Sequence, residues 1–137
     1  MTNHDKYTES RDAMEKYEEK RKYPRIIVDC SATLFFSEKQ KAEVLIHDIC
    51  PGGIQVRCDK QTAQILKAEK DKATNDFGMD FELLLEGEQI KITVRCRLAY
   101  MVNIDDGIFS SGMQFTNMDN HNRKLLKRFI ESSMEPL

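Results

Sequence analysis

The amino-acid sequence predicts an all-β-dominated fold, a small antiparallel barrel or sandwich with one helix near its C-terminal end. Apolar and polar residues alternate with a period of two in about six short runs, and turn-forming residues separate these runs. After Asn117 the apolar spacing changes to the helical period of 3.6. A chain of 137 residues is long enough for one such domain with one core.

The expected strands place apolar side chains on one face and polar side chains on the other. The first run extends from Ile26 to Phe36, and the fifth alternates from Ile90 to Val102 without a break, so a bend or a bulge is expected in it. Gly112 lies inside the last run, where a bare backbone often marks the close approach of another group. The six runs cover residues 26–36, 42–46, 54–58, 79–85, 90–102 and 109–115.

The segments outside these runs are helical or polar. An apolar stripe predicts a closing amphipathic helix that Asp119 or Asn120 can cap; its members are Leu125, Leu126, Phe129 and Ile130. Residues 60–76 are polar and are interpreted as an insertion that can form a helix. The expected organisation is a polar N-terminal tail or helix over 1–19, the β domain with its C-terminal helix over 20–133, and a C-terminal tail over 134–137. Pro24 marks the end of any helix in the tail.

Composition excludes several classes of protein. The net charge is −2, so there is no overall basic field of the kind that drives non-specific nucleic-acid binding. The spacing of the four cysteines fits neither a zinc site nor a disulfide framework, and they are interpreted as free thiols. No signal peptide or membrane-spanning run is present, so a soluble cytoplasmic protein without membrane insertion is expected.

The first candidate motif is RKYPR, from Arg21 to Arg25, at the junction between the tail and the first strand. One interpretation is a solvated basic linker. The other rests on guanidinium chemistry, because a planar fork of N–H donors can bind a phosphate, pair with guanine O6 and N7, or stack on a base. Two arginines on a hinge could then close over a guanine nucleotide.

The second candidate motif is DICPGG, from Asp48 to Gly53, between two expected strands. It can be a plain hairpin turn, in which Asp48 caps the turn, Pro51 fixes φ and the glycines take positive φ. It can also be a ligand cradle. The Asp48 carboxylate would then accept hydrogen bonds from guanine N1–H and N2–H₂, and Gly52 and Gly53 would let a ligand approach the backbone.

Together the two motifs resemble those of the PilZ domain family. Arg21 and Arg25 match its RxxxR segment before the first strand, and Asp48 and Gly53 match its [D/N]xSxxG turn between the second and third strands. Cys50 stands where the family usually has Ser. The stretch GMQF at 112–115, followed by an amphipathic helix, is similar to the closing strand and helix of the family. The resemblance covers about residues 20–131.

This resemblance implies a six-stranded antiparallel β-barrel that binds cyclic di-GMP, a bacterial second messenger, and needs no cofactor. A thiol is a weaker hydrogen-bonding group than a hydroxyl, so Cys50 is expected to preserve binding in weakened form. Lys20, before the first arginine, favours a stacked pair of ligands over a single one. The ligand-binding residues implied are Lys20, Arg21, Arg25, Asp48, Cys50, Gly52, Gly53 and Gly112.

Two other classes are disfavoured by the residues. A catalytic arrangement of Cys50 with His47 and Asp48 is poor, because adjacent strand residues point to opposite faces. A nucleic-acid-binding sheet needs several exposed aromatic and basic residues, and Phe35, Arg95 and Arg97 are too few. No enzyme activity and no direct DNA binding are therefore expected.

The remaining expectation is a receptor or adaptor. Cyclic di-GMP would dock on the barrel, the segment from Arg21 to Arg25 would close over it, and the N-terminal segment would move to expose or hide a surface for a partner protein. The alternative is a scaffold of the same fold that binds no ligand and acts through protein contacts alone. The two arginines favour the receptor.

Overall fold

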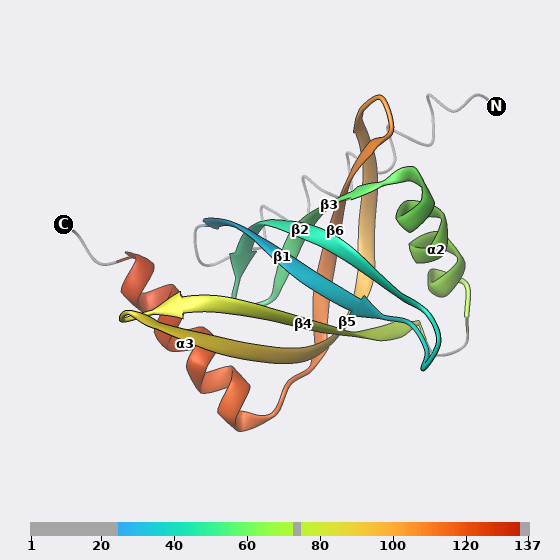
Figure 1. The fold of residues 1–137 in the computed structure, drawn as a ribbon. Helices are drawn as coiled ribbons and strands as arrows, with labels where there is room; N and C mark the ends of the chain where they lie inside the picture. Colours follow the sequence, from blue (N-terminus) through green and yellow to red (C-terminus); the bar gives the residue numbers. More distant parts are fainter. Residues whose placement is uncertain (1–24, 73–74, 135–137) are drawn as a thin grey trace.

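The structure is a computed structural model that describes residues 25–72 and 75–134. Six antiparallel strands form a closed barrel in the order β1-β2-β3-β6-β5-β4 (Figure 1). Their bounds are Ile26–Phe35 for β1, Lys41–Cys50 for β2, Gly53–Asp59 for β3, Asp76–Leu85 for β4, Glu88–Asp105 for β5 and Ile108–Asn117 for β6. The barrel predicted from the sequence resemblance is confirmed.

The interior of the barrel is filled by one apolar face of every strand. Leu34, Ile54, Met79, Ile92 and Met113 come from five different strands and are fully buried. The alternation in the sequence therefore corresponds to inward and outward side chains, as expected for strands that are buried on one face. Pairing of β1 with β4 over residues 32–35 closes the ring.

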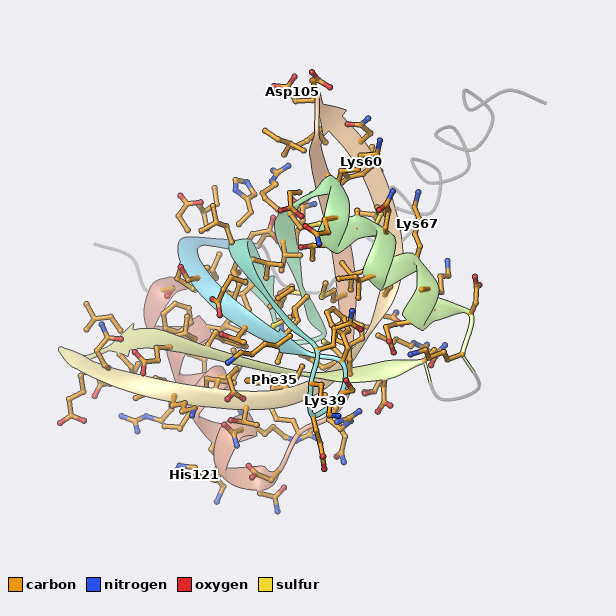
Figure 2. The ribbon with its side chains drawn as sticks, turned by 45° about the vertical axis from the view of Figure 1, so that its right-hand side comes forward. Phe35, Lys39, Lys60, Lys67, Asp105 and His121 are labelled. Atoms are coloured by element: carbon orange, nitrogen blue, oxygen red, sulfur yellow. The ribbon has the colours of Figure 1, made fainter. Side chains whose placement is uncertain are left out.

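Two helices lie on opposite sides of the barrel (Figure 1). The helix α2, Lys60–Lys70, occupies most of the predicted polar insertion, and its Ala63 and Leu66 are buried in the core. Figure 2 shows Lys60 and Lys67 on α2 and Asp105 at the tip of the β5–β6 hairpin. The predicted closing helix is α3, which spans Asn120–Met134.

The caps of both helices are aspartates. Asp59 Oδ1 accepts a hydrogen bond of 2.8 Å from the backbone N–H of Thr62 at the start of α2. Asp119 Oδ1 accepts one of 2.8 Å from the backbone N–H of Asn122, so Asp119 caps α3, as one of the two predicted alternatives had it. Each cap satisfies an N–H that has no partner inside its helix. None of the helices in the described ranges combines the length and apolar character needed to span a bilayer.

The four cysteines are free, as predicted. Cys50, Cys58 and Cys96 are buried and Cys30 is partly buried. Burial raises the pKa of the Cys96 thiol to about 12, so this thiol stays protonated and unreactive at neutral pH.

Register shifts interrupt several strand pairs. Three of them fall between Ile27 and Cys30 in β1, between Ile46 and Asp48 in β2, and between Leu98 and Tyr100 in β5. The bulge predicted for the long strand β5 is confirmed, whereas the other two were not predicted. Each extra residue reverses which side chains face the core further along its strand.

Candidate functional site

The bulge in β2 decides where Asp48 lies. Strict alternation from Val44 and Ile46, both buried in the core, would turn Asp48 inward as well. The extra residue at His47 instead places Ile49 in the core, and Asp48 therefore lies on the outer face of the barrel. The bulge residue His47 lies beside the other bulge, with its Nδ1 3.5 Å from Asp29 Oδ1.

Asp48 belongs to a row of paired residues that crosses five strands. Ile27 pairs with Asp48, Asp48 with Gln55, Gln55 with Gly112, and Gly112 with Tyr100. Because paired residues of neighbouring strands point to the same side of a sheet, these side chains share the outer face. The row brings together two predicted site residues, Asp48 and Gly112, that are 64 positions apart in the sequence.

Arg25 joins this row at its β1 end. Its Nη1 donates a hydrogen bond of 3.2 Å to Asp48 Oδ2. The Asp48 side chain is 2% exposed, whereas that of Arg25 is 32% exposed. A buried carboxylate requires an opposite charge or hydrogen-bond donors nearby, and Arg25 supplies both while still reaching solvent.

Gln55 and Tyr100 lie further along the same row. Gln55 Nε2 donates a hydrogen bond of 2.8 Å to Tyr100 Oη, and both residues are buried. The Tyr100 ring lies against Gly112, where an added Cβ would be 2.0 Å from Tyr100 Cε1. The close approach predicted at Gly112 is therefore that of an aromatic ring of the same chain. Contact of Gly112 with a ligand stays a prediction.

The turn between β2 and β3 is formed by Pro51 and Gly52. Cys50 is 3% exposed and pairs with Gly53, which is buried as well. The Gly52 carbonyl accepts a hydrogen bond of 3.0 Å from the Phe115 backbone N–H, which fixes the turn to β6. The plain-turn interpretation gave Gly52 and Gly53 positive φ angles, and this detail of it is wrong, because neither glycine has one. Pro51 holds a negative φ at the first turn position, as in turns that do not require a positive φ afterwards.

A second row of outward residues lies next to the first. Gly53 pairs with Gln114, and Gln114 pairs with Arg97. Arg97 donates from Nε and from Nη2 to Gln114 Oε1, each at 3.0 Å. Beside them is a hollow of about 480 Å³, lined by Gly52, Arg97, Gln114, Phe115 and Thr116.

A larger groove of about 790 Å³ lies between α3 and the β2–β3 turn. Its walls are mainly apolar and include Met118, Leu126 and Ile130. Gly52 lines both the groove and the polar hollow. The polar side chains of Arg97 and Gln114 line the hollow, so the hollow is the better candidate for binding a charged ligand.

The structure brings together most of the residues predicted from the sequence. Arg25, Asp48, Cys50, Gly52, Gly53 and Gly112 all belong to the two rows or to the turn between them. Lys20 and Arg21 lie outside the described residues. Gln55, Tyr100, Arg97 and Gln114 were not identified as site residues. Gln55 carried a usable signal, because it is a polar residue between apolar neighbours directly after the turn.

A family model for the PilZ domain matches residues 19–132. The chain belongs to the PilZ domain family. Both of its motifs lie in the matched range, and Cys50 replaces the Ser that the PilZ turn usually carries. A comparison with curated proteins finds no match.

Solved structures share the PilZ fold at low sequence identity. The inhibitor of motility MotI/DgrA of Bacillus subtilis has a TM-score of 0.64 and 12% identity, over 84% of this chain and 50% of that one. K. pneumonia MrkH in its apo state has a TM-score of 0.60 and 14% identity, over 84% and 52%. The PilZ domain of Escherichia coli YcgR, solved with c-di-GMP, has a TM-score of 0.55 and 15% identity, over 82% and 90%. The present chain thus spans about half the length of MotI and of MrkH.

Proposed function

We propose that this PilZ domain binds cyclic di-GMP on the outer face of its barrel, beside the β2–β3 turn. One observation carries the proposal: Arg25 Nη1 lies 3.2 Å from Asp48 Oδ2, although the two residues are 23 positions apart. The fold thus brings Arg25 of the arginine motif beside Asp48 of the turn motif. The PilZ domain of YcgR, which shares the fold, was solved with c-di-GMP, and this supports the same ligand here.

The chemistry of these residues matches that of the ligand. Cyclic di-GMP presents two guanines, each with N1–H and N2–H₂ donors, and two negatively charged phosphates. The Asp48 carboxylate is a suitable acceptor for the guanine donors, and the guanidinium of Arg25 is suited to a phosphate or to guanine O6 and N7. Arg21 is assigned the same chemistry from its place in the motif.

Gly52 gives the ligand access to the backbone of the turn. It is exposed, a Cβ added to it would meet no atom within 4 Å, and its φ is not positive. Neither steric room nor backbone conformation therefore requires glycine at this position. A remaining reason for glycine is that a planar base can lie against a backbone that carries no side chain.

We assign the signalling effect of ligand binding to the N-terminal segment. In this proposal residues 1–25 rearrange when Arg21 and Arg25 contact the ligand, and the rearrangement changes a surface that a partner protein recognises. Lys20 favours a stacked ligand pair. The chain acts as a receptor or adaptor in the cytoplasm and catalyses no reaction. It neither contacts DNA directly nor inserts into a membrane.

Calorimetric titration of the purified chain with cyclic di-GMP tests the proposal. Each charge-assisted contact is worth about 1.5–3 kcal/mol, so Arg21→Ala and Arg25→Ala should each weaken binding roughly tenfold to a hundredfold. Lysine at either position should not restore it, because an ammonium lacks the planar fork. Asp48→Ala should weaken binding at least as much, since it leaves guanine donors unpaired.

Arg128→Ala is the matched control. Arg128 is an exposed arginine that pairs with Glu86 at 3.1 Å, outside both motifs. Its removal should leave the affinity unchanged. Parental affinity in both Arg25→Ala and Asp48→Ala would show that the site is wrong and would favour the alternative, a PilZ scaffold that acts through protein contacts alone.

A further inference from the structure

The polar hollow beside the β2–β3 turn contains a positive charge that neither PilZ motif includes. Arg97 projects from β5 on the outer face and lines this hollow together with Gly52 and Gln114. Its side chain is held by the neutral Gln114 amide oxygen, which accepts from both Nε and Nη2. An arginine has five N–H donors, so this contact orients the guanidinium and leaves three donors available.

The contrast with Arg95, two residues earlier on the same face, is informative. Arg95 Nε lies 3.0 Å from Asp76 Oδ2, and Arg95 Nη2 lies 3.3 Å from Asp76 Oδ1. Hydrogen bonding between the two groups lowers the pKa of Asp76 and raises the pKa of Arg95, as expected for a matched ion pair. Within the described ranges, no carboxylate lies within 4.0 Å of the Arg97 guanidinium. Asp76 is the β4 residue that pairs in register with Arg97, but its carboxylate is held by Arg95, and Arg97 therefore keeps its charge for an anion.

The position of Arg97 fits a ligand with more than one negative group. Gly53, Gln114 and Arg97 form one row across three strands, so Arg97 lies about 10 Å from the turn backbone at a strand spacing near 4.8 Å. Arg25 reaches the neighbouring row at Asp48, on the β1 side of the turn. The two arginines therefore lie on opposite sides of the turn, on the same outer face.

We propose that Arg97 is a ligand-binding residue that contacts a phosphate of the cyclic dinucleotide, with Gln114 holding its guanidinium in place. This inference rests on the proposed function and adds a contact from β5 to it. It also implies that a ligand with two phosphates binds more tightly than a mononucleotide with one, because Arg25 and Arg97 approach the turn from opposite sides.

Three variants titrated with cyclic di-GMP test the role of Arg97. Arg97→Gln removes the charge and should weaken binding about tenfold to a hundredfold. Gln114→Glu leaves the arginine intact but gives it a carboxylate partner, like the one Arg95 already has, and should weaken binding to a similar extent. Arg128→Gln is the control, because Arg128 is an exposed arginine that pairs with Glu86 outside both motifs, and its affinity should stay within about twofold of the parent. Thermal melts of all three check the folding of each variant, and Gln114→Glu provides the test if Arg97→Gln does not fold.

The outcomes separate this inference from the proposed function. If Arg25→Ala weakens binding but Arg97→Gln and Gln114→Glu bind as the parent does, the role of Arg97 is wrong and the proposed function stands. Equal losses in Arg128→Gln and Arg97→Gln would also overturn it, because they would indicate a general effect of charge. A parent chain that does not bind cyclic di-GMP would overturn both proposals. Titration with GMP should show the smaller dependence on Arg97 that a single phosphate predicts, and an equal dependence would contradict the proposed selectivity.

Discussion

Gly52 and Gly112 lie on the same side of the barrel, and the structure distinguishes the reasons for the two glycines. At Gly112 the Tyr100 ring occupies the space of a side chain, with Cε1 at 2.0 Å from the position of a Cβ. At Gly52 the same space is open. Gly112 is therefore required for packing, whereas Gly52 is not required by the fold.

Alanine substitution at the two glycines should separate stability from binding. Gly112→Ala forces the Tyr100 ring away and strains its hydrogen bond with Gln55, so it should lower the free energy of unfolding by about 1–3 kcal/mol. Gly52→Ala should stay within about 0.5 kcal/mol of the parent and yet weaken cyclic di-GMP binding. Urea unfolding and calorimetry measure the two quantities. A Gly112→Ala chain as stable as its parent would contradict the packing role.

Cys50 is buried at the end of β2, where most PilZ turns carry serine. Cys50→Ser exchanges a weak thiol for a hydroxyl that forms a hydrogen bond of about 0.5–1.5 kcal/mol, so affinity for cyclic di-GMP should rise roughly twofold to tenfold. Calorimetry on the variant and the parent measures the change. An unchanged affinity would mean that this side chain has no contact with the ligand.

At the scale of elements, the alternation in the sequence predicts the strands but not their bulges. Extending the β2 pattern from Val44 and Ile46 turns Asp48 towards the core, and only the extra residue at His47 returns it to the outer face. Similarly, Tyr100 reaches the first row because of the shift after Leu98. A bulge depends on pairing with the neighbouring strand, so a single run of residues carries little signal for it. The role of the motif residues in ligand binding stays a prediction, and that prediction did not include Gln55 and Tyr100, which the bulges bring onto the same outer face.

The helix α2 was predicted only as a polar insertion that can form a helix. Its amphipathic pattern is weak, and its place is set by Ala63 and Leu66, which pack on the barrel core. This contact joins residues that are distant in the sequence, so the sequence could not identify it. The Asp59 cap is a local feature and accounts for where the helix begins.

Replacement of Asp59 tests the cap of α2 and its dependence on pH. Asp59→Ala should lower the free energy of unfolding by about 0.5–2 kcal/mol, and Asp59→Asn should preserve most of the cap. The hydrogen bond from the Thr62 backbone N–H lowers the pKa of Asp59. Its stabilising effect is therefore full above the pKa of the unfolded chain and is lost as pH falls through the lowered value.

Urea unfolding between pH 7 and pH 2 checks this effect. The stability advantage of the parent over Asp59→Asn should shrink as the medium becomes acidic. An advantage that grows at low pH would have the opposite sign and would contradict the role of the ionised carboxylate.

At the scale of the whole molecule, the period-two pattern and the helical C-terminal end were enough to predict the fold class. The strand order could not be predicted from the pattern, because the pairing of β3 with β6 connects residues 49 to 61 positions apart. That pairing places Gly53 beside Gln114 and Gln55 beside Gly112, and so creates both rows of the site. The barrel was predicted from the resemblance to the PilZ family, without knowledge of the strand pairing.

The proposed relay through the N-terminal segment can be tested by hydrogen exchange. Exchange at residues 15–25 should slow when cyclic di-GMP is added, because the arginines must become ordered against the ligand. GMP at the same concentration should leave exchange unchanged. If saturating cyclic di-GMP has no effect on these amides, the segment does not close over the ligand and the output arises elsewhere.

The central claim is that cyclic di-GMP binds across the two outer rows beside the β2–β3 turn. Amide chemical shifts of the ¹⁵N-labelled chain, recorded during titration with cyclic di-GMP, test it most directly. The largest changes should fall at Gly52, Gly53, Gln55, Arg97 and Gln114, and the β1–β2 hairpin around Lys39 should stay unchanged (Figure 2). Changes confined to the groove along α3, or no changes at saturating ligand, would contradict the account.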